Sequence, residues 1–178
     1  MRTYRKLLAL VCVVLFTVVP ANAQRKYFDA YVYDLTGHVK EAQISYAVNK
    51  LRYSYYFDKE GRLVDENGEL SEVERDAKGY VIVVNPSSHN FVELTYNSLH
   101  QVHSQMFWGF TTIYEYDKNK NLIKTYDEDN PEEGSYYVYT KFDDHINWIE
   151  RKEYDIKTKK YKDTMYRKIT YWSNNPFR

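Results

Sequence analysis

A nine-residue pattern that recurs along the chain constrains the fold more than any other feature. It reads aromatic, any residue, aromatic, Asp, two further residues, Gly, any residue, aliphatic. The two best copies run from Tyr31 to Val39 and from Tyr55 to Leu63. Their aspartates, Asp34 and Asp58, lie 24 residues apart, which is a spacing typical of repeat proteins. The chain is therefore predicted to be an array of one small structural unit.

Further copies keep only part of this pattern. The copy at Val73 to Val81 keeps Asp and Gly without the aromatic pair, whereas the copy at Tyr114 to Leu122 has Lys120 in place of Gly. Two weaker copies include Tyr96 and Phe142, and a related turn sequence starts at Asp65. The predicted turn residues are Asp34, Gly37, Asp58, Gly61, Asp65, Gly68, Asp76, Gly79, Asp117 and Asp143.

The pattern is typical of a β-hairpin. Asp at the first position of a turn accepts hydrogen bonds from the backbone ahead of it. Gly three residues later takes the left-handed conformation that closes a three-residue hairpin loop. Two aromatic residues separated by one residue lie on the same face of a strand. Each copy therefore predicts a strand, a tight turn and the start of a second strand.

These units add up to an all-β prediction: a single curved antiparallel sheet, a meander of hairpin repeats, open rather than closed, with about ten or more strands. Strands are expected at His38 to Ala47 and at Leu51 to Phe57, joined near Asn49 and Lys50. The stretch from Ile149 to Thr164 has no apolar stripe with helical spacing, and Arg167 to Trp172 is strand-like, so two more strands that turn near Ile156 to Thr158 are expected there. No linker divides residues 24–178, which are predicted to form one domain.

The N-terminus has the three parts of a cleavable signal peptide. Arg2, Arg5 and Lys6 precede an apolar run from Leu7 to Val19, and a small-residue site ends at Ala23. The apolar run is shorter than the roughly 20 residues that span a bilayer. We therefore expect residues 1–23 to be removed, the protein to be secreted or periplasmic, and no stable membrane insertion after cleavage.

Composition excludes several classes of protein. Removal of 23 residues from 178 leaves 155, and the single cysteine lies within the removed segment. These 155 residues carry 22 basic and 25 acidic side chains without a basic stripe, which argues against nucleic-acid binding. Aromatic residues make up 17% of the chain and 20 of them are tyrosine. Disordered proteins are poor in aromatic residues, so the composition predicts many half-buried strands.

The repeat resembles the YD repeat of RHS-type bacterial surface and toxin proteins. The resemblance rests on the Tyr-x-Tyr-Asp-x-x-Gly-x-Leu pattern and on the segment from Phe142 to Arg151, where Ile146 stands at the usual glycine position. In the large members of that family, many such hairpins form a continuous β-strip that winds into a shell. The resemblance implies a short, open sheet of degenerate copies in an exported bacterial protein. It implies a fold element and no particular chemistry.

Aromatic residues supply the candidate binding surface. They alternate along the predicted strands, where they either bind a sugar or an extended peptide or simply form the cross-strand pairs that stabilise a sheet. The apolar run from Met106 to Phe110 is either a strand buried on both faces, which is the ordinary explanation, or an exposed patch for a partner. The candidate residues are Tyr53, Tyr55, Phe107, Trp108, Tyr114, Tyr116 and Trp148.

No motif for catalysis, a cofactor or a metal is recognisable. Asp117, Asn119 and Asn121 imitate the spacing of a calcium loop, but Leu122 occupies the position that needs glycine. We therefore expect a binding module for a protein partner or a glycan, not an enzyme. The alternatives are a passive scaffold that associates edge to edge and, third, a glycan-acting hydrolase.

Overall fold

The computed structural model describes residues 27–48 and 50–173, so the predicted signal peptide at 1–23 lies outside the described residues. The described chain forms one 3₁₀ helix and a single antiparallel sheet of 12 strands that does not close on itself. The predicted all-β class and the open hairpin meander are therefore confirmed. The elements are η1 (Asp29–Tyr33), β1 (Val39–Tyr46), β2 (Arg52–Phe57), β3 (Leu63–Val64), β4 (Val73–Arg75), β5 (Val81–Val84), β6 (Val92–Tyr96), β7 (Val102–Phe107), β8 (Phe110–Tyr116), β9 (Leu122–Asp127), β10 (Gly134–Phe142), β11 (Trp148–Asp155) and β12 (Tyr161–Tyr171).

The order of the strands departs from a simple meander at one place. The sheet order is β3-β2-β1-β12-β11-β10-β9-β8-β7-β6-β5-β4. From β4 to β12 each strand pairs with the next one along the chain, and β12 then pairs with β1. As a result β3 and β4, which are consecutive in the chain, form the two opposite edges of the sheet.

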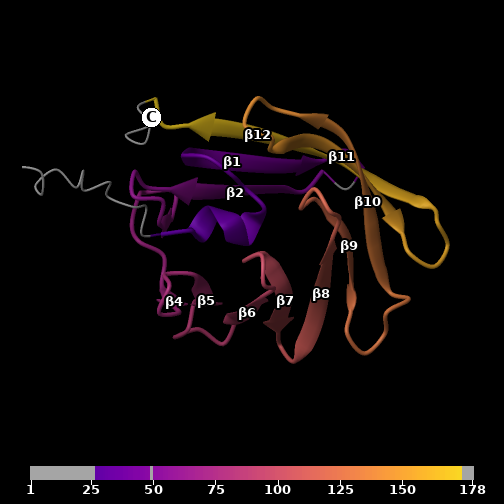
Figure 1. The fold of residues 1–178 in the computed structure, drawn as a ribbon, viewed down its shortest axis with the longest axis horizontal. Coiled ribbons are helices and arrows are strands. Elements are labelled where there is room, and N and C mark those ends of the chain that lie inside the picture. The colour runs from indigo at the N-terminus through magenta and orange to yellow at the C-terminus, as the bar shows by residue number, and fades with distance from the viewer. Residues whose placement is uncertain (1–26, 49, 174–178) are drawn as a thin grey trace, which may run out of the picture.

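The sheet bends so that its two halves face each other. In Figure 1, β1, β2 and β12 lie above, β4 to β8 lie below, and η1 lies between them. The carboxylate of Asp29 in η1 accepts hydrogen bonds from Leu63 N in β3, at 2.6 Å, and from Arg75 Nη2 in β4, at 2.7 Å. The helix therefore joins the two sheet edges, although β3 and β4 are not paired with each other.

Six hairpin turns share one pattern of hydrogen bonds. At Asp58, the backbone N–H donates to Arg62 O at 3.0 Å, Gly61 N donates to Asp58 O at 3.0 Å, and Asp58 Oδ1 accepts from Arg62 N at 2.8 Å. The fourth residue of each turn has a positive φ, which is 84° at Gly61 and 64° at Ile146. The turns begin at Asp58, Asp65, Asp76, Asn97, Asp117 and Asp143, with Gly61, Gly68, Gly79, His100, Lys120 and Ile146 at the fourth position.

The first copy of the repeat does not form the predicted hairpin. Its aromatic residues belong to the helix η1, which ends at Asp34 with φ 55°. The carboxylate of Asp34 accepts a hydrogen bond from Trp148 Nε1 at 3.0 Å, and Arg167 Nη1 donates to Asp34 O at 2.9 Å. These long-range contacts replace the local turn. Gly37 keeps a positive φ of 84°, but it lies in the connection to β1 and not in a hairpin turn.

The apolar run from Met106 to Phe110 is an exposed hairpin, so the interpretation as a buried strand is wrong. Phe107 and Phe110 face each other across a two-residue turn formed by Trp108 and Gly109. Both turn residues have positive φ, 53° and 81°, which matches the right-handed twist of the flanking strands. The exposed fractions of Trp108 and Phe110 are 68% and 70%.

The core is divided into three small clusters rather than one. The first contains Phe57 and Leu35 near η1, the second contains Ile44 and Met165, and the third contains Val81 and Leu94. Members of the second and third clusters, Ile44, Met165 and Leu94, line an open space between them together with polar and aromatic side chains. Within the described residues, no helix is long and apolar enough to cross a membrane.

Candidate functional site

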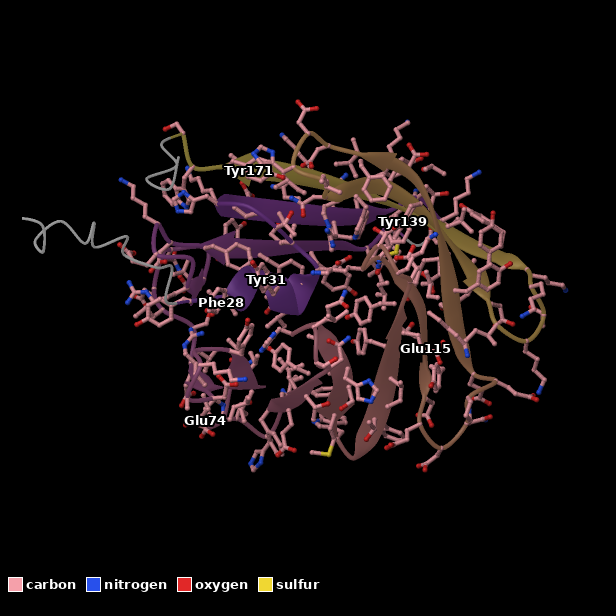
Figure 2. The ribbon with its side chains drawn as sticks, in the orientation of Figure 1. Phe28, Tyr31, Glu74, Glu115, Tyr139 and Tyr171 are labelled. Carbon is pink, nitrogen blue, oxygen red and sulfur yellow. The ribbon has the colours of Figure 1, made fainter. Side chains whose placement is uncertain are left out.

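A cavity of about 400 Å³ lies on the concave side of the sheet. Small-molecule sites usually have volumes of about 300–1,000 Å³, so the cavity is large enough for a ligand. Its walls come from the end of η1 and from strands in both halves of the sheet, including β1, β2, β8, β11 and β12. Figure 2 shows side chains from both halves extending into the space between them.

Tyrosines form most of the aromatic wall of the cavity. The ring of Tyr33 stacks on the ring of Tyr55 with a centroid distance of 3.9 Å. Three of the predicted binding residues, Tyr55, Tyr114 and Tyr116, are part of this wall. The complete set of lining tyrosines is Tyr33, Tyr46, Tyr55, Tyr114, Tyr116 and Tyr137.

Three of these hydroxyl groups are held by the protein itself. Tyr114 Oη donates to Gln105 Oε1 at 2.8 Å, and Tyr137 Oη bonds Thr125 Oγ1 at 2.9 Å. Tyr116 Oη donates to the backbone oxygen of a residue in β7 at 2.8 Å. These three tyrosines therefore have fixed hydroxyl positions.

The other three hydroxyl groups are available to a ligand. Within the part of the chain that the structure describes, no hydrogen bond is made by the hydroxyl groups of Tyr33, Tyr46 and Tyr55. Burial raises the pKa of Tyr46 to about 12 and also raises the pKa of Tyr55 and Tyr33. These phenols are protonated at neutral pH, so each has a hydrogen to donate.

Two buried arginines lie against one tryptophan at the cavity. The guanidinium carbon of Arg167 is 3.7 Å from the ring centroid of Trp148, and that of Arg151 is 4.2 Å from the same centroid. Arg151 also lies 4.2 Å from the centroid of Tyr137. Both arginines line the cavity, and cation–π contacts with electron-rich rings favour their positions. The predicted residue Trp148 thus supports the cavity from behind, with 2% of its surface exposed.

Neither arginine is neutralised by an ion pair. Within the described residues, no carboxylate lies within 4.0 Å of either guanidinium. Asp34, the acidic residue of the cavity wall, accepts instead from Trp148 Nε1. Burial raises the pKa of Asp34, and the positive charges of Arg167 and Arg151 oppose this shift. With Asp34 ionised, the cavity still carries one excess positive charge.

The hydrogen-bonding capacity of the two arginines is incompletely used. Arg151 Nε donates to Met165 Sδ at 3.3 Å, and its Nη1 lies 3.4 Å from Tyr139 Oη. A thioether is a weak acceptor. Arg167 donates to the carbonyl oxygens that end η1, but its buried Nε has no partner within the described residues. Donors therefore outnumber acceptors in this part of the cavity.

A repeated tyrosine contact explains why rings accumulate on the concave side. Tyr96 Oη donates to Val81 O at 2.6 Å, and Tyr139 Oη donates to Leu122 O at 2.7 Å. Each acceptor belongs to the first buried aliphatic residue after a turn, and each donor comes from a neighbouring hairpin. Tyr116 makes the same contact with Val102 O. The repeat thus links adjacent units through phenol-to-backbone bonds.

The remaining predicted surface residues lie outside the cavity wall. Tyr53 is next to Tyr46, with ring centroids 6.1 Å apart, and is partly exposed. Phe107 and Trp108 stack on each other at the tip of the β7–β8 hairpin, away from the cavity. Trp108 Nε1 donates to His89 O at 3.2 Å. The seven predicted residues therefore do not form one surface, because Tyr53 lies apart from both the cavity wall and the hairpin tip.

Arg151 and Arg167 were not predicted from the sequence. Arg151 is three residues from Trp148, which places it on the opposite face in a regular strand. Register shifts between β10 and β11 bring the side chains of Trp148 and Arg151 to the same side of the sheet. No local pattern in the sequence signals these shifts. The only available signal is an arginine in each of two strands that also carry aromatic or apolar residues.

Within the described residues, no group of three or more His, Cys, Asp or Glu side chains is placed to hold a metal ion. The concave site thus combines aliphatic side chains and tyrosine rings with three phenol hydroxyls that have no hydrogen-bonded counterpart and two guanidiniums that have no charged side-chain counterpart among the described residues. A comparison of the chain with known protein families and with curated proteins found no match in either.

Proposed function

We propose that this protein is an exported binding module that holds a glycan in its concave cavity. The observation that carries the proposal is the wall of tyrosines with three unused hydroxyl groups, on Tyr33, Tyr46 and Tyr55. Aromatic rings present flat apolar surfaces to sugar rings, and the phenol hydroxyls bond sugar oxygens. A cavity of about 400 Å³ favours one or two sugar residues over a folded protein domain.

Export is the part of the proposal that rests on sequence. The apolar run from Leu7 to Val19 and the site ending at Ala23 support cleavage and release. The six equivalent hairpin turns support the resemblance to YD repeats of bacterial surface proteins. The edges of the sheet support binding over edge-to-edge assembly, because β3 and β4 have only two and three residues and short edges resist pairing.

The test is binding of a panel of soluble mono- and oligosaccharides to the purified protein, measured by titration calorimetry. Tyr55→Leu removes a ring and a free hydroxyl from the cavity and should weaken binding strongly. Tyr56→Leu is the matched control, because Tyr56 is the next residue of β2 and points to the opposite face. Equal loss in both variants, or no binding by the unmodified protein, would contradict a glycan site in the cavity.

A second candidate function is docking of a protein partner at the β7–β8 tip. Trp108 and Phe110 are more than two thirds exposed, and Phe107 stacks against Trp108. Exposed aromatic clusters of this kind are typical of protein interfaces. Affinity capture from envelope extract tests it: a specific protein that is lost with Trp108→Ser and retained with Tyr55→Leu supports the tip as the interface.

A further inference from the structure

The positive charge of the cavity indicates which class of glycan it binds, which the tyrosines alone do not. Arg151 and Arg167 have only 7% and 5% of their surface exposed, and within the described residues neither has a carboxylate within 4.0 Å. Buried charges in proteins are ordinarily paired or hydrogen-bonded in full. Here two guanidiniums share a wall with a single carboxylate, that of Asp34.

The contacts that the two arginines do make leave donors unused. A guanidinium has five N–H groups. Arg167 directs two of its nitrogens to the carbonyl oxygens of Tyr33 and Asp34, and its buried Nε has no acceptor among the described residues. Arg151 has a thioether and one distant phenol as partners. Arg151 therefore has N–H groups that a ligand oxyanion would satisfy, and Arg167 adds a second positive charge at the same Trp148 ring.

The tyrosines add donors next to the same wall. The free hydroxyl groups of Tyr46 and Tyr55 line the cavity together with the two arginines. Arg151 lies against Tyr137 as well as Trp148, so an anion bound at its guanidinium would have aromatic rings beside it. The cavity therefore combines cationic donors, neutral donors and flat rings.

We infer that the ligand of this cavity is an acidic sugar, whose anionic group is held by Arg151 next to the positive charge of Arg167 while its ring lies against the tyrosine wall. This inference rests on the proposed function, since it names the class of glycan bound at that site. Guanidinium groups bind carboxylate and sulfate oxygens alike through charge-assisted hydrogen bonds. The shared chemistry is thus a sugar ring with one oxyanion.

The experiment compares four probes on the unmodified protein by titration calorimetry. D-glucuronate carries a carboxylate, its methyl ester is the uncharged counterpart, D-glucose 6-sulfate carries a sulfate ester, and D-glucose is neutral. We expect one or both anionic sugars to bind about tenfold or more tightly than glucose and the ester, because charged hydrogen bonds are the strong ones. The tighter anion identifies the natural group.

Variants then assign the preference to the arginines. Arg151→Met keeps most of the side-chain volume and should abolish the preference for the anionic sugar, whereas Arg151→Lys should retain part of it. Lys152→Met is the matched control, because it removes one positive charge from the next residue of β11, on the opposite face. It should leave the preference unchanged.

The possible results separate this inference from the proposed function. Equal affinity of the unmodified protein for all four probes would overturn the acidic-sugar inference and leave the glycan site standing. Absence of binding by all four probes would overturn both. Because the comparison of acid and ester uses unmodified protein, it decides the matter even if Arg151→Met fails to fold.

Discussion

Asp29 and Arg75 lie 46 residues apart in the chain and form an ion pair that joins the two edges of the sheet. The Asp29 side chain is fully buried, and its second function is to accept the backbone N–H of Leu63 in the other edge strand. One carboxylate in a 3₁₀ helix therefore connects the two edge strands, which a ladder of backbone hydrogen bonds would connect in a closed sheet.

Loss of the cation from this pair should destabilise the fold strongly. Arg75→Met leaves a buried carboxylate without its counter-ion, and breaking such pairs costs about 3–5 kcal/mol. Because Arg75 is itself partly exposed, we expect a decrease near about 3 kcal/mol in the free energy of unfolding, measured by denaturant titration. Arg52→Met, at an exposed position of β2, is the control and should change stability little. A small effect of Arg75→Met would show that the edges are held by other contacts.

Because the fourth residue of each turn has a positive φ, substitution by glycine and substitution of glycine at this position should change stability in opposite directions. Ile146 has φ 64° and a side chain that is 79% exposed, so it bears strain without burying apolar surface. Ile146→Gly should stabilise the protein by about 0.5–1 kcal/mol, whereas Gly61→Val at φ 84° should destabilise it by more than about 1 kcal/mol. Thermal unfolding of the two variants measures both. Equal melting temperatures for all three proteins would contradict the assigned turn geometry.

The phenol-to-backbone bonds between repeats should each contribute measurably to stability. Tyr96→Phe removes only the hydroxyl that donates to Val81 O and leaves a buried carbonyl unpaired. We expect a loss of about 1–2 kcal/mol in the free energy of unfolding. Tyr56→Phe, on the convex face, serves as the control in the same denaturant titration. A neutral Tyr96→Phe would mean that the hydroxyl is not needed for the contact between units.

The raised pKa values of the buried tyrosines predict that the protein unfolds at high pH. Burial raises the pKa of Tyr46, Tyr114 and Tyr139 to about 12, whereas an unfolded chain has the ordinary value of 10.0. The folded state therefore keeps protons that the unfolded state releases. The resulting stability is fully present below pH 10.0, and it is lost as pH rises through about 12.

A spectroscopic pH titration measures this loss. The ultraviolet absorbance of tyrosinate and the near-ultraviolet circular dichroism should change together for the buried tyrosines, because ionisation and unfolding are linked. Ionisation of all tyrosines in a single step with the dichroism intact would contradict the burial described here.

The sequence predicts the turns well because their chemistry is local. Asp58 and Gly61 supply the acceptor and the left-handed position within four residues, and His100, Lys120 and Ile146 take the same backbone angle without being glycine. Trp108 and Gly109 form a two-residue turn that the apolar run conceals. At the six turns that begin with Asp or Asn, local pattern and local structure agree because no distant residue competes for the turn's hydrogen bonds.

The site was less predictable because its parts come together through tertiary contacts. Asp34 belongs to one of the two most complete copies of the repeat. Trp148 and Arg167 nevertheless bond to it, and it does not begin the predicted hairpin turn. Register shifts between β10 and β11 accompany the placement of Arg151 at the cavity beside Trp148. Tyr55 was identified by its alternation along one strand, whereas its stacking partner Tyr33 stands in a helix that the pattern does not predict.

The position of β1 within the sheet has a consequence for synthesis of the protein. Ile44 in β1 pairs with Arg167 in β12, so the first strand to be made finds its partner only when the last one appears. Until then β1 to β3 form a small isolated group, and long-range pairing of this kind slows folding. If the chain began at β4 and continued from β12 into η1 and β1, the strands would follow the sheet in strict order. The described strands thus have the order that a circular permutation of a simple meander would give, and the pairing of β1 with β12 completes the sheet.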